Sequence, residues 1–215
     1  MFQNDPMVSF RMNFNTETPN NFGTKITLIR HANTYNNQNN IWTGEIDAPI
    51  IKPTIKKDMQ NYDLVLSSTA LRCRQTLDML EFNNNPKIIF DDSFLEAGYG
   101  SLTGKSKNSY NFKREFFNKP PESDIYNSES IFEAGIRSYF GFSYLADNYI
   151  ERKSNILILS HKNTLKGLWA FLNLDHMIYS HDFINLEEIE NIIKININTE
   201  NIPDFNNLET YNITI

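Results

Sequence analysis

The sequence predicts a three-layer α/β/α sandwich with a mostly parallel central sheet. Short, nearly continuous apolar runs, typical of strands buried on both faces, alternate along the chain with segments of helical periodicity. Strands that alternate with helices favour a parallel sheet covered by helices. The chain has 215 residues, the length of one domain, and its 40% of hydrophobic residues is enough for a sizeable core.

Six short runs have the composition of strands. Three of them are nearly continuous and rich in β-branched residues, as expected for strands buried on both faces: residues 25–30, 63–67 and 155–160. The other three predicted strands lie at 87–90, 192–197 and 211–215.

Three segments between these runs have helical patterns. The first follows Ser68 and places apolar side chains three or four residues apart: Cys73, Leu77 and Leu80. The second starts at a capping box of Ser130 and Glu133, and a stripe with four-residue spacing predicts its inner face: Phe132, Ile136, Phe140 and Tyr144. The third has an apolar face of Leu165, Leu168, Trp169 and Leu172.

Composition limits the class of protein and its expected compartment. The net charge of −6 argues against a nucleic-acid-binding protein. No apolar run reaches the roughly 18 residues of a membrane span, and the polar first 24 residues lack the apolar centre of a signal peptide. The single cysteine, Cys73, fits a reducing compartment and is expected in the core, so we expect a cytoplasmic protein. Residues 1–24 are predicted to form a loose arm before one domain at 25–215.

Two of the four histidines directly follow predicted strands. His31 comes after the run at 25–30, and His161 comes after the run at 155–160. Ligands of open α/β sheets bind at the carboxyl ends of strands, so these two histidines are candidates for one site. The alternative is that each histidine only caps its strand and bonds to the backbone. The matching contexts of the two favour the site.

Arg30 directly precedes His31 at the strand end, where the turning chain lets both side chains converge. A guanidinium fork binds phosphate oxygens in pairs, and a neutral histidine beside it is suited to attack a phosphoryl group. A metal site is the competing interpretation. Neither histidine, however, has a partner histidine, a cysteine pair or an acidic cluster at a ligand spacing. The sequence therefore predicts phosphoryl transfer without a metal.

Four sequence blocks resemble the histidine phosphatase superfamily and, within it, the cofactor-dependent phosphoglycerate mutases. They occur in the family's order and cover most of residues 25–175. The first, RHANTYNNQNNIWTG at 30–44, aligns without a gap with the family's RHG block and the stretch that follows it. The others resemble the family's blocks for the second arginine, the catalytic glutamate and the second histidine, and they begin at Ser68, Leu95 and His161. The resemblance implies a phosphoglycerate mutase-like fold.

The resemblance also implies a role for each matching residue. His31 would be the nucleophile that becomes a phosphohistidine, and Glu96 would donate and accept protons. The phosphoryl oxygens would be held by Arg30, Arg72 and His161, with neutral donors from Asn37 and Asn163. Further substrate contacts are expected from Thr43, Gly44 and Tyr99.

A basic cluster resembles the mutases in particular. Lys107 falls where the mutases have a substrate-binding lysine, and Lys113 with Arg114 resembles the arginine pair that binds the substrate carboxylate. This alignment needs a gap, so a solvated basic helix face stays the alternative. If the cluster lines the site with His31, a substrate with a carboxylate is favoured. If it points to solvent, a phosphatase is favoured.

Some positions depart from the family pattern. Ala32 and Lys162 replace the glycines after the two histidines, and a side chain would strain the backbone there if φ is positive. Lys162 is also expected to reach the substrate phosphate from a helix start. Ala97 replaces an arginine and removes one substrate contact. The predicted lid, at about 97–130, is shorter than in the mutases and would exclude water less well.

The activity expected first is interconversion of 3-phosphoglycerate and 2-phosphoglycerate, a glycolytic reaction, primed by 2,3-bisphosphoglycerate. The first alternative is a metal-independent phosphatase that uses water as the acceptor. The second is an inactive paralogue that only binds, which Ala32 and Lys162 suggest. A small phosphorylated metabolite is the expected partner, without nucleic acid or membrane, and a homodimer is compatible with the sequence.

Overall fold

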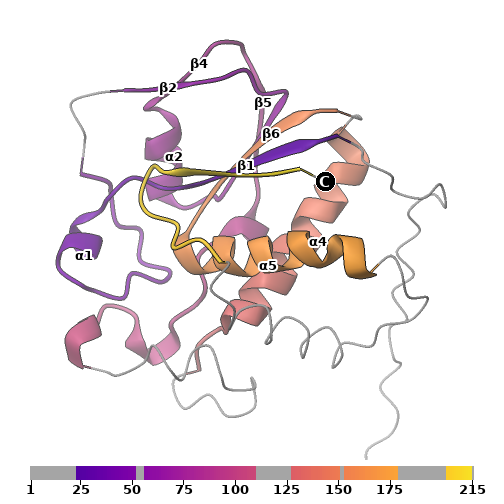
Figure 1. Ribbon diagram of the computed structural model, residues 1–215. Helices are drawn as coiled ribbons and strands as arrows, with labels where there is room; N and C mark the ends of the chain where they lie inside the picture. Colours follow the sequence, from indigo (N-terminus) through magenta and orange to yellow (C-terminus); the bar gives the residue numbers. More distant parts are fainter. Residues whose placement is uncertain (1–22, 52–55, 110–126, 151–152, 179–201, 215) are drawn as a thin grey trace, which may run out of the picture.

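The computed structural model in Figure 1 has a central sheet between helices, and it describes residues 23–51, 56–109, 127–150, 153–178 and 202–214. The sheet has the strand order β5-β3-β6-β1-β7. Its strands are β1 (Lys25–Arg30), β3 (Leu64–Ser67), β5 (Lys87–Phe90), β6 (Asn155–Ser160) and β7 (Thr210–Thr214). All neighbours pair in parallel except β7, which is antiparallel to β1. The predicted, mostly parallel sheet is confirmed.

Helices cover both faces of this sheet. Two long helices that pack on each other cover one face, α4 (Ile131–Tyr149) and α5 (Lys162–Ile178). A short helix, α2 (Leu71–Leu77), packs on the other face. The four-residue helix α1 (Tyr35–Gln38) follows β1, and a second small sheet pairs β2 (Lys57–Met59) with β4 (Leu80–Phe82). The layers are those of the predicted α/β/α sandwich.

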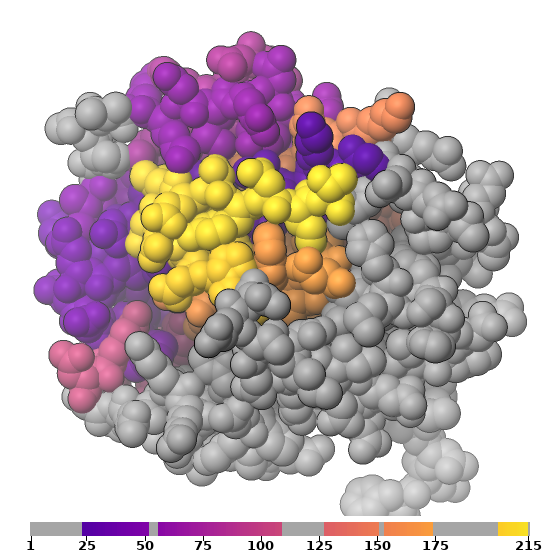
Figure 2. Space-filling model, in the orientation of Figure 1, coloured from indigo at the N-terminus to yellow at the C-terminus, as the bar shows by residue number. Residues whose placement is uncertain are grey.

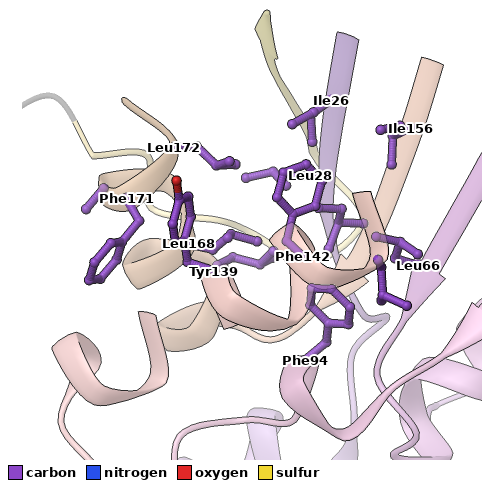
Figure 3. Packing of buried hydrophobic residues seen from close by; sticks show 14 of the residues in the cluster. Ile26, Leu28, Leu66, Phe94, Tyr139, Phe142, Ile156, Leu168, Phe171 and Leu172 are labelled. Atoms are coloured by element: carbon purple, nitrogen blue, oxygen red, sulfur yellow. The ribbon is translucent and has the colours of Figure 1, made fainter. Parts of the chain in front are cut away.

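The central strands are buried on both faces because alternate side chains enter different cores. Leu28 and Ile158 belong to the larger core beneath α4 and α5. Figure 3 shows Leu28 in this core together with Phe94. Ile29 and Leu159 point the other way, into the smaller core with Cys73 and other residues of α2. Continuous apolar runs are therefore what this sheet requires, as the sequence indicated.

Helix α4 begins at the predicted capping box. Ser130 Oγ accepts the N–H of Glu133, and the Glu133 carboxylate accepts the N–H of Ser130. The predicted inner stripe is wrong at its far end, because Phe140 is 39% exposed and Tyr144 is 69% exposed. A spacing of four residues overshoots each helical turn by about 40°, so the stripe turns away from the core. The buried face consists of Ile131, Ala134, Gly135, Ser138, Tyr139, Phe142 and Leu145.

Two glycines allow α4 and α5 to cross in backbone contact. A Cβ on Gly135 would lie 2.9 Å from Gly167 Cα, and a Cβ on Gly167 would lie 2.5 Å from Ile131 O. Neither position has room for a side chain. The crossing fixes the start of α5, and with it His161 and Asn163, against α4.

One further expectation is corrected, and three others lie partly or wholly outside the described residues. Leu80 was expected on the first helix, but α2 ends at Leu77 and Leu80 begins β4. The predicted strand at 192–197 lies outside the described residues, as do residues 1–22 of the predicted arm at 1–24 and residues 110–126 of the predicted lid. Within the described ranges, no helix has both the length and the apolar character needed to cross a membrane.

Candidate active site

The carboxyl ends of β1 and β6 bring the two predicted site histidines together. Arg30 pairs with Ser160 in the sheet register, so the residues that follow them, His31 and His161, are neighbours. Their ring centroids are 5.1 Å apart. The adjacent strand β3 leads into α2, which carries Arg72. The edge of the sheet thus assembles the predicted constellation from three distant parts of the chain.

His31 is a buried, neutral base with a defined tautomer. Its Nδ1 lies 2.7 Å from Ala32 O. Because a carbonyl oxygen can only accept, Nδ1 carries the proton and the lone pair is on Nε2. Burial, followed by the charges of Arg30 and Arg72, holds the pKa of His31 well below its usual range. Nε2 is therefore free of a proton near neutral pH and can act as a nucleophile.

Arg30 offers donors to an anion beside His31. Its Nη1 donates to Phe205 O at 3.4 Å, whereas its buried Nε has no hydrogen-bond partner in the described part of the chain. Burial lowers the pKa of Arg30, and the negative charge of Glu96 works in the opposite direction. A buried donor of a charged group is costly when unpaired, so an oxyanion of a ligand would fit here.

Arg72 is held by three hydrogen bonds. Its Nε donates to His161 Nδ1 at 3.1 Å, and its two terminal nitrogens donate to Ile46 O and Gly44 O at 3.0 Å each. Gly44 has a φ of +48°, and a Cβ there would lie 2.8 Å from Thr103 Oγ1. Only glycine therefore places this carbonyl against Arg72, and the remaining guanidinium N–H groups stay available for a ligand.

His161 is neutral and has the opposite tautomer. Its Nδ1 accepts from Arg72, so Nε2 carries the proton and donates to Ser68 Oγ at 2.8 Å. Burial, and then the charge of Arg72, hold the pKa of His161 well below its usual range. In this structure both ring nitrogens bond within the protein, so His161 orients Arg72 as well as flanking His31.

The carboxylate of Glu96 lies beside the first turn of α5. Its Oε1 accepts the N–H groups of Ala97 at 3.0 Å and Asn163 at 3.3 Å. Asn163 Nδ2 donates to the hydroxyl of Tyr99 at 2.8 Å. Burial, followed by the charge of Glu96, raises the pKa of Tyr99 well above its usual value. Glu96, Tyr99 and Asn163, three of the predicted site residues, thus form one cluster, and the charges of Glu96 and Tyr99 act on Arg30.

Arg137 of α4 holds the loop that carries Glu96. Its Nε and Nη2 form a bidentate pair with Glu129 at 2.9 Å and 2.7 Å. The same guanidinium donates to Ser93 O at 2.8 Å and to Leu95 O at 3.2 Å. Because Leu95 directly precedes Glu96, this arginine fixes the backbone from which the carboxylate projects.

Among the predicted substrate contacts, Thr43 has a hydroxyl group that is suited to bind a ligand. Its buried Oγ1 has no hydrogen-bond partner within the described residues, which suits a ligand oxygen. Asn37 is committed locally, because its Oδ1 accepts from Thr34 N at 3.1 Å and its N–H completes the capping box of α1. Lys107 Nζ lies 5.0 Å from the centre of the Trp42 ring, which is in tilted contact with the ring of Tyr99. Lys113 and Arg114 lie outside the described residues.

Lys162 is engaged in an ion pair in this structure. The ammonium group that was expected to reach a substrate phosphate pairs with Asp204 at 2.6 Å. Neither Lys162 nor Ala32 has a positive φ, so the replacement of glycine strains the backbone at neither position. The two departures that suggested an inactive protein therefore have no backbone cost.

Cys73 is a core residue, as predicted. Its side chain is fully buried, and Sγ lies 3.6 Å from His161 Nε2. Burial raises the pKa of the Cys73 thiol to about 12. The thiol therefore stays protonated at neutral pH and is a poor nucleophile.

Several residues that support the site were not predicted from the sequence. Asn207 bonds to His31, and Asp204 pairs with Lys162, from a segment whose sequence carries no helix or strand pattern. Glu129 and Arg137 flank the recognised capping box and pair with each other, yet Arg137 also bonds to Leu95 O, which lies 42 residues earlier in the chain. Thr76 stands in a matching block, and only the structure gives its contact with Ala32.

Comparison with known proteins places the chain in a family. The sequence profile of the histidine phosphatase superfamily (branch 1) matches residues 26–183. This span is most of the chain, so the protein belongs to the histidine phosphatase superfamily. It is a mutase or a phosphatase of that superfamily.

Curated relatives are similar at low identity. The 2,3-bisphosphoglycerate-dependent phosphoglycerate mutase of Bartonella bacilliformis is 24% identical over 166 residues, which cover 66% of this chain and 78% of that protein. The protein of the same name from Chlamydia trachomatis serovar L2 is 24% identical over 190 residues, covering 67% and 82%.

Solved structures confirm the phosphoglycerate mutase-like fold. A protein titled Mycobacterial hydrolase 1 superimposes with a TM-score of 0.58 at 13% identity and covers 87% of each chain. Bacillus stearothermophilus YhfR has a TM-score of 0.55 at 19% identity, covering 75% of this chain and 86% of its own. A mycobacterial glucosyl-3-phosphoglycerate phosphatase has a TM-score of 0.54 at 16% identity, covering 69% and 81%. These likenesses concern the fold alone.

Proposed function

We propose that the protein transfers phosphoryl groups through a phosphohistidine at His31 and interconverts 3-phosphoglycerate and 2-phosphoglycerate. The contact that carries this proposal is the one between His31 Nδ1 and Ala32 O, which leaves the Nε2 lone pair beside two guanidinium groups. Arg30 Nε and Thr43 Oγ1 can both donate and have no partner among the described residues, so they suit the oxygens of a phosphorylated ligand, including 2,3-bisphosphoglycerate as primer.

The proposed reaction has two steps. His31 Nε2 attacks phosphorus while the bond to the leaving oxygen breaks, and a protonated Glu96 gives its proton to that oxygen. Glu96 then takes the proton of an acceptor hydroxyl, whose oxygen receives the phosphoryl group from His31. Arg30 and Arg72 offset the charge of the equatorial oxygens in both steps. Side chains supply all the positive charge, so the proposed reaction needs no metal ion.

The substrate carboxylate is assigned to the side of Lys107. Its ammonium group lies over Trp42, whose ring centre is 4.7 Å from that of Tyr99. Tyr99 in turn bonds to Asn163 in the Glu96 cluster. The ammonium group of Lys107 is therefore separated from the Glu96 cluster only by the ring of Trp42. A cation at this place favours a substrate that has a second anionic group. The names of the curated relatives support the same substrate.

One observation favours a second candidate, a phosphatase on a small phosphorylated metabolite. Ala97 stands where the mutases have an arginine, and it is fully buried against Trp42 and Tyr99. No cation can reach a substrate from this position. A substrate held less firmly leaves room for water as the acceptor. The names of two of the solved neighbours, a hydrolase and a phosphatase, are compatible with that outcome.

One assay separates these activities. Conversion of 3-phosphoglycerate is followed with and without 2,3-bisphosphoglycerate, while released inorganic phosphate is measured in the same samples. We expect conversion that depends on the primer, with slow phosphate release. Phosphate release without isomerisation would replace the mutase by the phosphatase. A folded protein with neither activity would support the binding paralogue.

A further inference from the structure

The peptide bond between His31 and Ala32 is held from both sides. Its N–H, which belongs to Ala32, donates to Thr76 Oγ1 at 2.8 Å. Its carbonyl, which belongs to His31, accepts from Asn207 Nδ2 at 2.6 Å. Since a peptide unit is planar, two bonds at opposite edges fix the orientation of the whole plane. Thr76 comes from α2, and Asn207 comes from the segment that leads into β7.

Both side chains are themselves fixed. Thr76 is fully buried, and its hydroxyl proton is used in a 2.6 Å bond to Arg72 O, so an oxygen lone pair faces Ala32. Asn207 forms a backbone bridge with Arg30, and the next residue, Leu208, donates its N–H to Arg30 O at 3.1 Å. The C-terminal segment, yellow in Figure 2, lies along the strand that ends at the site.

This peptide plane controls the tautomer of His31. The covalent path from His31 Nδ1 to its acceptor, Ala32 O, passes through the peptide bond between the two residues. Rotation of that plane would separate Nδ1 from the oxygen at 2.7 Å and leave a buried N–H without a partner. The neutral ring would then favour the tautomer with its proton on Nε2. That tautomer has no lone pair at the attacking atom.

We propose that Thr76 and Asn207 are positioning residues that keep His31 in the tautomer with Nε2 unprotonated, and so link the C-terminal segment to the reactivity of the site. The consequence for catalysis rests on the proposed role of His31 as nucleophile. The tautomer itself belongs to the free protein and does not depend on that role.

The test measures the tautomer first. Nitrogen NMR of protein with labelled histidine, with His31 assigned by loss of its signals in His31→Gln, reports which ring nitrogen carries the proton. We expect the proton on Nδ1 in the wild type and in Thr76→Ser, which keeps the hydroxyl. Thr76→Val and Asn207→Ala should shift it toward Nε2. Asn206→Ala is the matched control, because Asn206 is exposed and bonds to Glu209.

The second measurement is the rate at which 2,3-bisphosphoglycerate phosphorylates the enzyme. We expect it to fall roughly 10- to 100-fold in Thr76→Val and Asn207→Ala, and to stay unchanged in Asn206→Ala. If Thr76→Val does not fold, Asn207→Ala, with its half-buried side chain, decides alone. An unchanged tautomer in folded Asn207→Ala would overturn the inference. A wild type that is never phosphorylated would instead count against the proposed function, while the NMR result would stand.

Discussion

Lys162 Nζ and Asp204 Oδ1 form an ion pair at 2.6 Å, and Lys166 Nζ lies 3.2 Å from the same oxygen. Partial burial would raise the pKa of Asp204, but the bonds and charges of the two lysines outweigh it and hold that pKa below its usual value. A lysine at the first residue of a helix is unfavourable beside the positive end of the helix dipole. Asp204 offsets this charge and joins the C-terminal segment to α5.

The ion pair and the unstrained backbone at Lys162 determine what is expected of Lys162→Gly. Lys162 has helical backbone without strain, so glycine relieves nothing and loosens the first turn of α5. We expect the free energy of unfolding to fall by about 0.5–1 kcal/mol, with little change in the Michaelis constant. Chemical denaturation and steady-state kinetics measure both. Lys162→Ala removes the ion pair without adding glycine, and a rise in stability of either variant would show that the pair is unfavourable.

Arg137→Lys keeps the positive charge at this position but removes the planar guanidinium group. The bidentate pair with Glu129 and the bonds to Ser93 O and Leu95 O cannot all be replaced by one ammonium group. We expect the free energy of unfolding to fall by about 2 kcal/mol and kcat to fall as the loop carrying Glu96 moves. Arg74→Lys is the control, since Arg74 is exposed and donates to Thr69 O on the surface. Equal effects of the two substitutions would contradict this role of Arg137.

Acid should destabilise the protein through its two buried histidines. Burial first, and then nearby arginine charge, lower the pKa of His31 and His161 in the folded state only. Below about pH 6.5 the two histidines bind protons in the unfolded chain but stay neutral in the folded chain. The free energy of unfolding therefore falls as the pH falls. Each histidine contributes up to about 1.4 kcal/mol per pH unit. Denaturation curves between pH 7.5 and 5 test this, and His31→Gln should flatten the slope; an unchanged slope would contradict it.

Activity should survive removal of metal ions. Arg30 and Arg72 supply the charge at the proposed phosphoryl position, and no group of three or more acidic, histidine or cysteine side chains in the described ranges could hold a metal. The measurement is turnover after dialysis against EDTA, compared with untreated enzyme. Loss of turnover that magnesium or zinc restores would refute the proposed mechanism.

The parts of the fold that depend on local sequence patterns could be predicted from the sequence. The strands β1, β3 and β6 are continuous apolar runs because helices cover both faces, and the residues at their ends were recognisable as a site. The inner face of α4 was predicted wrongly at its far end, because a four-residue repeat turns away from the core by about 40° per turn. Leu80 fitted a helical spacing, yet pairing with β2 placed it in a strand.

The contacts that support the site could not be predicted from the sequence, for a different physical reason. Asn207 and His31 are 176 residues apart, and Lys162 meets Asp204 only because the C-terminal segment returns along β1. Nothing in the neighbouring residues of either pair signals these contacts. They depend on tertiary packing, which local sequence patterns do not encode.

The proposed chemistry depends on transfer of the phosphoryl group to His31 Nε2. The most direct measurement traps the phosphoenzyme formed with labelled 2,3-bisphosphoglycerate and locates the phosphorus by mass spectrometry and phosphorus NMR. We predict an acid-labile, base-stable phosphate on Nε2 of His31 and no label in His31→Ala. Label that persists in His31→Ala, or phosphate on Nδ1, would contradict it.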